Sequence, residues 1–112
     1  MKIALPVAQG RLCLHFGHCE KFAVFEVDEN SKSVTGNYDL DAPPHQPGLL
    51  PRWLSENGIN CVIAGGMGSR AQGFFEEYKV KVIVGAPPEE PARIVEDYLG
   101  GKLVTSGNTC DH

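Results

Sequence analysis

The residues best suited to chemistry lie close together near the start of the chain. Two thiols and two imidazoles fall within residues 13–19, which read CLHFGHC. Soft sulfur and borderline nitrogen ligands suit zinc, copper(I) or an iron–sulfur centre far better than magnesium or calcium. We expect Cys13, His15 and Cys19 to be metal ligands. Whether His18 binds metal stays open. Because the two cysteines are not spaced as a Cys-x-x-Cys, the alternative is a turn in which the thiols are buried without a function.

Two further groups of donors lie far from this stretch in the sequence. Cys110 and His112 form a Cys-x-His at the end of the chain, on an arm that could fold back over a site, although ends are often frayed. His45 lies in a proline-rich loop that restricts the backbone, where it either binds metal or faces solvent. We expect all three side chains to be metal ligands.

A glycine loop is the third feature of interest. It consists of Gly65, Gly66, Met67 and Gly68 and precedes Ser69, a fair N-cap for a helix. The loop is neither a Walker A motif nor a complete Gly-x-Gly-x-x-Gly. It can still present backbone N–H groups to an anionic ligand or cluster, and Met67 adds a thioether at its tip. The alternative is a tight turn whose glycines serve packing.

Composition limits the classes of function. The chain has 112 residues and a net charge of −4, which argues for one domain and against general binding to nucleic acid or to anionic membranes. The apolar run at the start of the chain is too short for a signal peptide and contains a proline, and no apolar stretch is long enough to span a membrane. We therefore expect a cytoplasmic protein, whose four cysteines are kept reduced and serve as ligands rather than in disulfides.

Hydrophobic periodicity predicts alternating strands and helices. Strands are expected at 3–7, 22–27, 32–38, 59–64 and 80–84, and helices at 49–57, 70–78 and 87–99. The second and third strands should form an antiparallel hairpin, and residues 41–48 a loop. Residues 9–11 should break the first strand. Cys61 lies within a buried strand and is expected to be a core residue.

This order predicts a single α/β domain, a mixed five-stranded sheet with helices on its faces, over residues 1–100. Residues 101–112 form a tail that carries the Cys-x-His. The loops beyond the carboxyl ends of parallel strands gather at one edge of such a sheet and form the ligand crevice. We therefore expect the Cys/His stretch and the glycine loop to share an edge. The weak third strand is a candidate edge for a homodimer.

Catalysis finds little support in the sequence. There is no Gly-x-Ser-x-Gly elbow and no recognisable pair of catalytic carboxylates. A reactive-thiol enzyme using Cys13 or Cys19 is the remaining enzymatic alternative, because a neighbouring histidine can lower a thiol pKa. We expect the protein not to be an enzyme.

Several of these motifs resemble the dinitrogenase iron-molybdenum cofactor biosynthesis family. The similar stretches are His15-Phe16-Gly17-His18-Cys19, then Phe22, Ala64-Gly65-Gly66-Met67-Gly68, Arg70-Ala71 and Val82-Ile83-Val84-Gly85-Ala86. Residues 44–52 and the Cys-x-His ending look like a subgroup of it. The resemblance implies a ribonuclease H-like three-layer fold. It also implies binding of nitrogenase cofactor precursors or, in one branch, of a molybdenum–copper sulfide cluster.

By position, the resemblance places a cluster-contacting histidine at His15 and the family's glycine–methionine loop at Gly65–Gly68. The expected roles of Cys13, Cys110 and His112 are inferred instead from the chemistry of their thiol and imidazole groups. The first strand lacks the acidic residue that ribonuclease H enzymes use to bind metal, so a two-metal nuclease is not expected.

The resulting hypothesis is a small carrier or chaperone of a metal ion or a metal–sulfur cluster, similar to an iron-molybdenum cofactor precursor. Iron, molybdenum, copper and zinc are the candidate metals, and a client or cofactor-assembly protein is the expected partner. One alternative is a redox or regulatory protein in which Cys13 and Cys19 form a reversible disulfide. Another is a structural zinc site without transfer.

Overall fold

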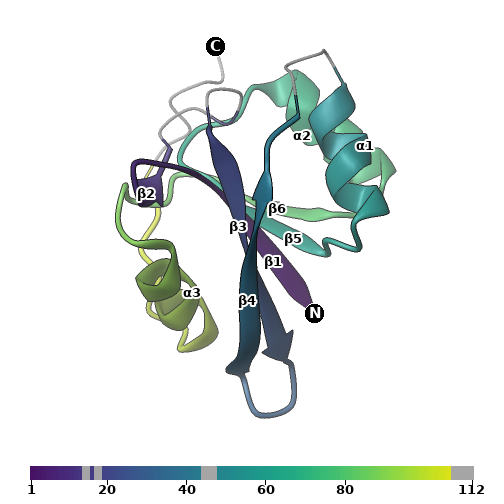
Figure 1. Ribbon diagram of the computed structural model, residues 1–112. Helices are drawn as coiled ribbons and strands as arrows, with labels where there is room; N and C mark the ends of the chain where they lie inside the picture. Colours follow the sequence, from purple (N-terminus) through teal and green to yellow (C-terminus); the bar gives the residue numbers. More distant parts are fainter. Residues whose placement is uncertain (14–15, 17–18, 44–47, 107–112) are drawn as a thin grey trace.

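A computed structural model describes residues 1–13, 16, 19–43 and 48–106. Over these residues the chain forms one α/β domain of strands and helices (Figure 1). The elements are β1 (Lys2–Ala8), β2 (Arg11–Leu12), β3 (Lys21–Asp28), β4 (Ser33–Asp41), α1 (Leu49–Glu56), β5 (Cys61–Ile63), α2 (Ser69–Glu77), β6 (Lys81–Ile83) and α3 (Pro91–Leu99). The predicted hairpin and the three predicted helices are confirmed.

The strands form one mixed sheet in the order β4-β3-β1-β5-β6, with β2 paired only to β1. β1 is parallel to β5, and β5 to β6, whereas β3 is antiparallel to both β1 and β4. Within the described residues the sheet therefore has six strands, not the predicted five. The prediction of five strands was wrong because it missed the short strand β2.

β2 arises from a tight turn where the sequence predicted only a break. Gln9 (φ 54°) and Gly10 (φ 77°) both have left-handed backbones, and Ala8 pairs with Arg11 on either side of them. Two successive positive φ values are the signature of a two-residue type I′ hairpin. The chain therefore folds back on β1 at once, and this brings Cys13 to the end of β1.

Two hydrophobic cores cover the two faces of the sheet, which gives three layers (Figure 1). On one face, strand residues pack against Ile94 and Val95 of α3. On the other face they pack against Leu50 and Leu54 of α1 and Phe75 of α2. β1 lies between these cores with its five central residues buried, as a strand covered on both faces requires.

The starts of two helices differ from the sequence prediction. α2 begins at Ser69 and its N-cap is Gly68, so the expected Ser69 cap is wrong: Ser69 is already helical. α3 begins at Pro91 and not at residue 87, and its first turn contains no acidic residue. Glu90 is extended (ψ 134°) because a residue before proline avoids the helical region.

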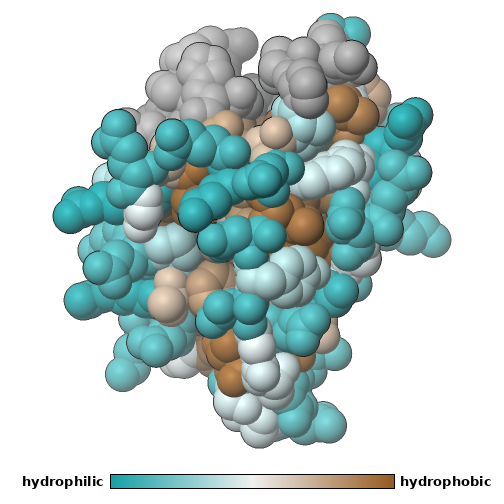
Figure 2. Space-filling model, viewed as in Figure 1, coloured by the Kyte–Doolittle hydropathy of each residue, from teal (hydrophilic) through white to brown (hydrophobic). Residues whose placement is uncertain are grey.

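β4 forms one edge of the sheet, and most of its residues are exposed. Polar side chains cover most of the surface seen in Figure 2, with smaller apolar areas between them. Among the residues that the structure describes, no helix is long and apolar enough to cross a membrane.

Candidate metal site

Backbone hydrogen bonds to the end of β1 hold Cys13, the first residue of the Cys/His stretch, and Glu20, the residue that directly follows the stretch. The Cys13 N–H donates to the Pro6 carbonyl at 2.9 Å, and the Glu20 N–H donates to the Val7 carbonyl at 3.0 Å. Cys13 directly follows β2, and Cys19 lies shortly before β3. The ends of the stretch therefore lie at the carboxyl end of β1, where ligands bind in open α/β sheets.

Phe16 anchors the middle of this stretch to the protein body. Its side chain is only 6% exposed, and its ring lies 5.5 Å from that of Phe75 in a T-shaped contact and 5.8 Å from that of Phe22. Its N–H donates to the Gly66 carbonyl at 3.0 Å. This hydrogen bond joins the Cys/His stretch to the glycine loop, so the two predicted motifs do meet at one edge of the sheet.

The glycine loop is fixed by its own carbonyl groups. The Gly65 carbonyl accepts from the Gly85 N–H at 2.7 Å, the Gly66 carbonyl from Phe16, and the Met67 carbonyl from Gln72 Nε2 at 2.9 Å. Gly65 and Gly66 are buried and Ser69 is exposed. Met67, expected at the loop tip, is 1% exposed and packs in the core beneath α1 and α2.

The pKa values of the Cys13 and Cys19 thiols are both raised. Burial, followed by the charge of Cys13, raises the pKa of Cys19 to about 11, although a backbone hydrogen bond acts in the opposite direction. Burial and then the charge of Glu20 raise the pKa of Cys13. Both side chains are half-buried. Thiols in this state are protonated at neutral pH, and a metal ion would release their protons on binding.

The remaining predicted ligands lie outside the described residues: His15, His45, Cys110 and His112, together with His18. Their roles stay predictions. Across residues 1–13, 16, 19–43 and 48–106, no group of three or more His, Cys, Asp and Glu side chains is arranged to hold a metal ion. The described part of the site is thus the thiol pair and the glycine loop.

Glu20 is a site residue that the sequence analysis missed. Its carboxylate Oε1 accepts the Gln9 N–H at 2.9 Å, and its carbonyl accepts the Ala42 N–H at 3.3 Å. It therefore connects the β1–β2 turn, the Cys/His stretch and the start of the proline-rich loop. The only available signal was an acidic residue directly after Cys19.

Comparison with known proteins identifies the family. The family model described as dinitrogenase iron-molybdenum cofactor matches residues 1–101. The chain belongs to this family. It is also 34% identical over 107 residues to the uncharacterized protein MJ0580 of Methanocaldococcus jannaschii, which covers 92% of this chain and 89% of that protein. The family predicted from the sequence is therefore confirmed.

Solved structures share the fold of this dinitrogenase iron-molybdenum cofactor family member. The crystal structure of PH0822 matches with a TM-score of 0.87 at 23% identity, over 95% of each chain. The apo form of the orange protein from Desulfovibrio gigas matches with a TM-score of 0.71 at 20% identity, over 96% of this chain and 93% of that one. At these identities the likeness shows the fold alone.

Proposed function

We propose that this protein binds a metal ion or a metal–sulfur cluster at the carboxyl edge of its sheet and acts as a small carrier. Membership of the dinitrogenase iron-molybdenum cofactor family supports a cofactor-related role. The observation that carries the proposal is the placement of two half-buried thiols, Cys13 and Cys19, near the carboxyl end of β1, in a stretch hydrogen-bonded to the glycine loop. Two adjacent soft donors suit zinc, copper or iron, alone or as part of a sulfide cluster.

The other predicted ligands complete the proposed site. His15 would bind beside the two thiols, His45 from the proline-rich loop, and Cys110 and His112 from the end of the chain. Because these donors come from loops and from a terminus, cargo could enter and leave without unfolding the domain. Transfer to a client or cofactor-assembly protein, without catalysis, is part of the proposal.

The raised pKa values of the Cys13 and Cys19 thiols argue against a nucleophilic or redox role for the metal-free thiols. A redox-active or nucleophilic cysteine needs a lowered pKa, because the thiolate is the reactive form. Burial and nearby negative charge have the opposite effect on Cys13 and Cys19. A bound metal ion supplies the positive charge that stabilises both thiolates.

The same proposal includes a ribonuclease H-like fold, a cytoplasmic location and no nucleic-acid or membrane partner. It also includes assembly as a homodimer, with the monomer as the alternative. The exposed strand β4 is the candidate edge for a homodimer. Analytical ultracentrifugation with and without metal measures the oligomeric state directly.

The test is metal, sulfide and absorption analysis of untagged protein purified without oxygen. The wild-type chain is compared with Cys13→Ser/Cys19→Ser and with Cys61→Ala, a control that removes a thiol buried in β5. We expect stoichiometric iron, molybdenum or copper, with sulfide and charge-transfer bands, in the wild type and in the control but not in the double variant.

Two other results would contradict the carrier function. Colourless protein with one zinc ion, lost in the double variant and not transferred to an acceptor, would indicate a structural zinc site. Protein that stays free of metal and sulfide after anaerobic reconstitution, and whose thiols titrate differently after oxidation, would indicate a redox role for Cys13 and Cys19.

A further inference from the structure

Glu20 directly follows the Cys/His stretch and connects three segments at the carboxyl edge of the sheet. Its N–H donates to the Val7 carbonyl at 3.0 Å, and its own carbonyl accepts the Ala42 N–H at 3.3 Å. Its carboxylate Oε1 accepts the Gln9 N–H at 2.9 Å. Any residue except proline could make the two backbone bonds, whereas the third bond requires this side chain. The identity of residue 20 therefore matters through its bond to Gln9.

Gln9 lies in the tight turn between β1 and β2. Its φ of 54° is left-handed, a conformation that residues other than glycine, asparagine and aspartate rarely adopt. The acceptor of its N–H is a carboxylate, and hydrogen bonds to an ionised acceptor are stronger than those between neutral groups. The Glu20 carboxylate therefore stabilises a turn that a Gln-Gly pair favours only weakly.

This turn determines where Cys13 lies. It leads directly into β2, whose two residues pair with the last two residues of β1. Cys13 follows β2 at once, and its N–H donates to the Pro6 carbonyl at 2.9 Å. At the other end of the stretch, Glu20 directly follows Cys19. The bond between Glu20 and Gln9 therefore joins the segment that carries Cys19 to the turn that places Cys13.

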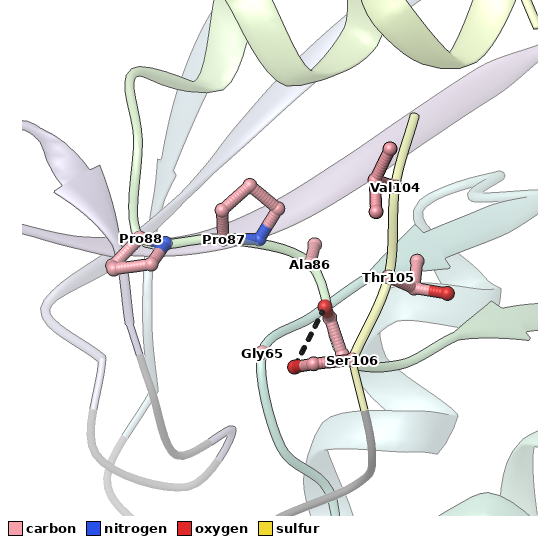
Figure 3. A pocket seen from close by; sticks show the side chains of 8 residues that line it. Gly65, Ala86, Pro87, Pro88, Val104, Thr105 and Ser106 are labelled. Atoms are coloured by element: carbon pink, nitrogen blue, oxygen red, sulfur yellow. Dashed lines mark hydrogen bonds between the residues drawn. The ribbon is translucent and has the colours of Figure 1, made fainter. Parts of the chain in front are cut away.

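A second hydrogen bond to β2 comes from a loosely packed segment. The Leu12 N–H donates to the Glu89 carbonyl at 3.0 Å. Glu89 directly follows residues 86–88, which line a cavity of about 290 Å³ together with residues 104–106 (Figure 3). A segment that lines a cavity has fewer packing contacts to hold it in place. We therefore expect Glu20 to fix the position of β2 more firmly than this bond does.

Glu20 lies near the thiols without forming a metal site with them. Burial, and then the charge of Glu20, raises the pKa of Cys13. Across the part of the chain that the structure describes, however, no three His, Cys, Asp or Glu side chains are arranged to hold a metal ion. The Glu20 carboxylate is also engaged by Gln9. These observations favour a supporting role over that of a ligand.

We propose that Glu20 is a positioning residue for metal binding: its carboxylate holds the Gln9 turn and thereby keeps Cys13 in place relative to Cys19. This inference rests on the proposed function. It adds a residue that contacts no metal ion but determines how well the two thiols are arranged to bind one.

The test is a Co²⁺ titration of the reduced, full-length chain, which measures affinity and the thiolate-to-cobalt charge-transfer absorption. Glu20→Ala should weaken Co²⁺ binding by about 10-fold, an effect typical of groups that orient metal ligands, and should reduce the absorption per bound ion. Glu20→Gln should stay within about threefold of the wild type, because its amide oxygen can still accept the Gln9 N–H in a weaker, neutral bond. Both variants lose the negative charge, so the difference between them isolates the hydrogen bond.

A substitution at position 9 tests the role of the turn. Gln9→Asn gives an Asn-Gly pair, which favours a type I′ turn more strongly than Gln-Gly does. In this background the turn should no longer need the carboxylate, so Glu20→Ala should weaken Co²⁺ binding by less than about twofold. Because the Glu20 side chain is exposed, we expect each variant to fold, and circular dichroism checks this.

Asp28→Ala is the matched control. Asp28 Oδ1 accepts the Asn30 N–H at 2.9 Å in the turn between β3 and β4, so this carboxylate also holds a turn through one backbone bond. It lies at the end of β3 that is farthest from the carboxyl end of β1. Asp28→Ala should leave Co²⁺ affinity and the charge-transfer absorption unchanged.

Equal weakening by Glu20→Ala and Glu20→Gln would overturn the inference, because Glu20 would then act through its charge or as a ligand. An undiminished effect of Glu20→Ala in the Gln9→Asn background would overturn it as well. Unchanged affinity in Glu20→Ala would overturn it while leaving the carrier proposal intact. A wild-type chain that binds no Co²⁺ would overturn both, so failure of the proposed function is recognised separately.

Discussion

At the scale of single residues, the three described cysteines divide into two kinds. Cys13 and Cys19 are half-buried at the carboxyl edge, and each is influenced by neighbouring charge. Cys61 is 1% exposed in β5, in the core beneath α3. The sequence predicted this division, because Cys61 lies within a continuous apolar run whereas the other two flank polar and glycine residues. Cys61 is thus a natural internal control for every thiol measurement.

Cys61 also gives a prediction on alkaline stability. Burial is the main cause that raises its pKa from an ordinary 9.0 to about 11. A raised pKa in the folded state stabilises the protein below pH 9, and this contribution is lost between pH 9 and pH 11, where only the unfolded chain gives up its proton. Two pKa units correspond to about 2–3 kcal/mol. Chemical denaturation from pH 8 to pH 11 should show a smaller fall in the free energy of unfolding for Cys61→Ala than for the wild type.

The outcome that would contradict this reading is an identical pH profile for the two proteins. Some alkaline loss should remain in Cys61→Ala, since the pKa of Cys19 is also raised to about 11. A Cys19→Ser variant measured in the same way separates the two contributions.

At the scale of elements, Phe16 is the contact that places the Cys/His stretch. Phe16→Ala removes two ring contacts and opens a cavity between the stretch and α2, which should cost about 3 kcal/mol of unfolding free energy. Co²⁺ affinity should fall as well, because the Phe16 N–H bond to Gly66 would no longer be held by a buried ring. Denaturation and cobalt titration measure the two effects.

Phe25→Ala is the matched control for Phe16→Ala. Phe25 is likewise 6% exposed but lies in β3 on the α3 face of the sheet. It should lose comparable stability while keeping Co²⁺ affinity. Equal loss of affinity in both variants would mean that Phe16 acts only through overall stability.

The elements themselves were largely predictable, and the errors have local causes. Strands buried on both faces read as continuous apolar runs, which is why β1 and β5 were found from the sequence. β6 was found because it is also an apolar run, although it lies at an edge of the sheet and is only partly buried. β2 was missed because a Gln-Gly pair is a weaker turn signal than Asn-Gly, although both residues adopt positive φ. The starts of α2 and α3 were misplaced by one to four residues, since the extended backbones of Gly68 and Glu90 are set by context as well as by residue type.

The candidate site was predictable in its motifs but not in its connections. The meeting of the Cys/His stretch and the glycine loop follows from parallel strand order, and the Phe16–Gly66 bond confirms it. The contacts of Glu20 and Gly85 could not be read from the sequence. Each joins segments that are separated along the chain: Glu20 contacts Gln9 and Ala42, and Gly85 contacts Gly65 and Ser106.

At the scale of the whole molecule, binding at one edge should stabilise the entire domain. A ligand at 100 times its dissociation constant adds about 2.7 kcal/mol to the free energy of unfolding. For a chain of 112 residues this should raise the melting temperature by about 10 °C. Calorimetry with Zn²⁺ and then with a chelator should show a reversible shift in the wild type and in Cys61→Ala. A similar shift in Cys13→Ser/Cys19→Ser would place the metal elsewhere.

The most direct test of the central claim is X-ray absorption at the zinc edge of the Zn²⁺-loaded, reduced protein. Two thiolates of the carboxyl edge should contribute sulfur neighbours about 2.3 Å from the metal. We predict that at least two sulfur ligands are present in the wild type and in Cys61→Ala, and that two of them are lost in Cys13→Ser/Cys19→Ser. A first shell made of oxygen and nitrogen alone, or a sulfur count unchanged in the double variant, would contradict the assignment of Cys13 and Cys19 as metal ligands.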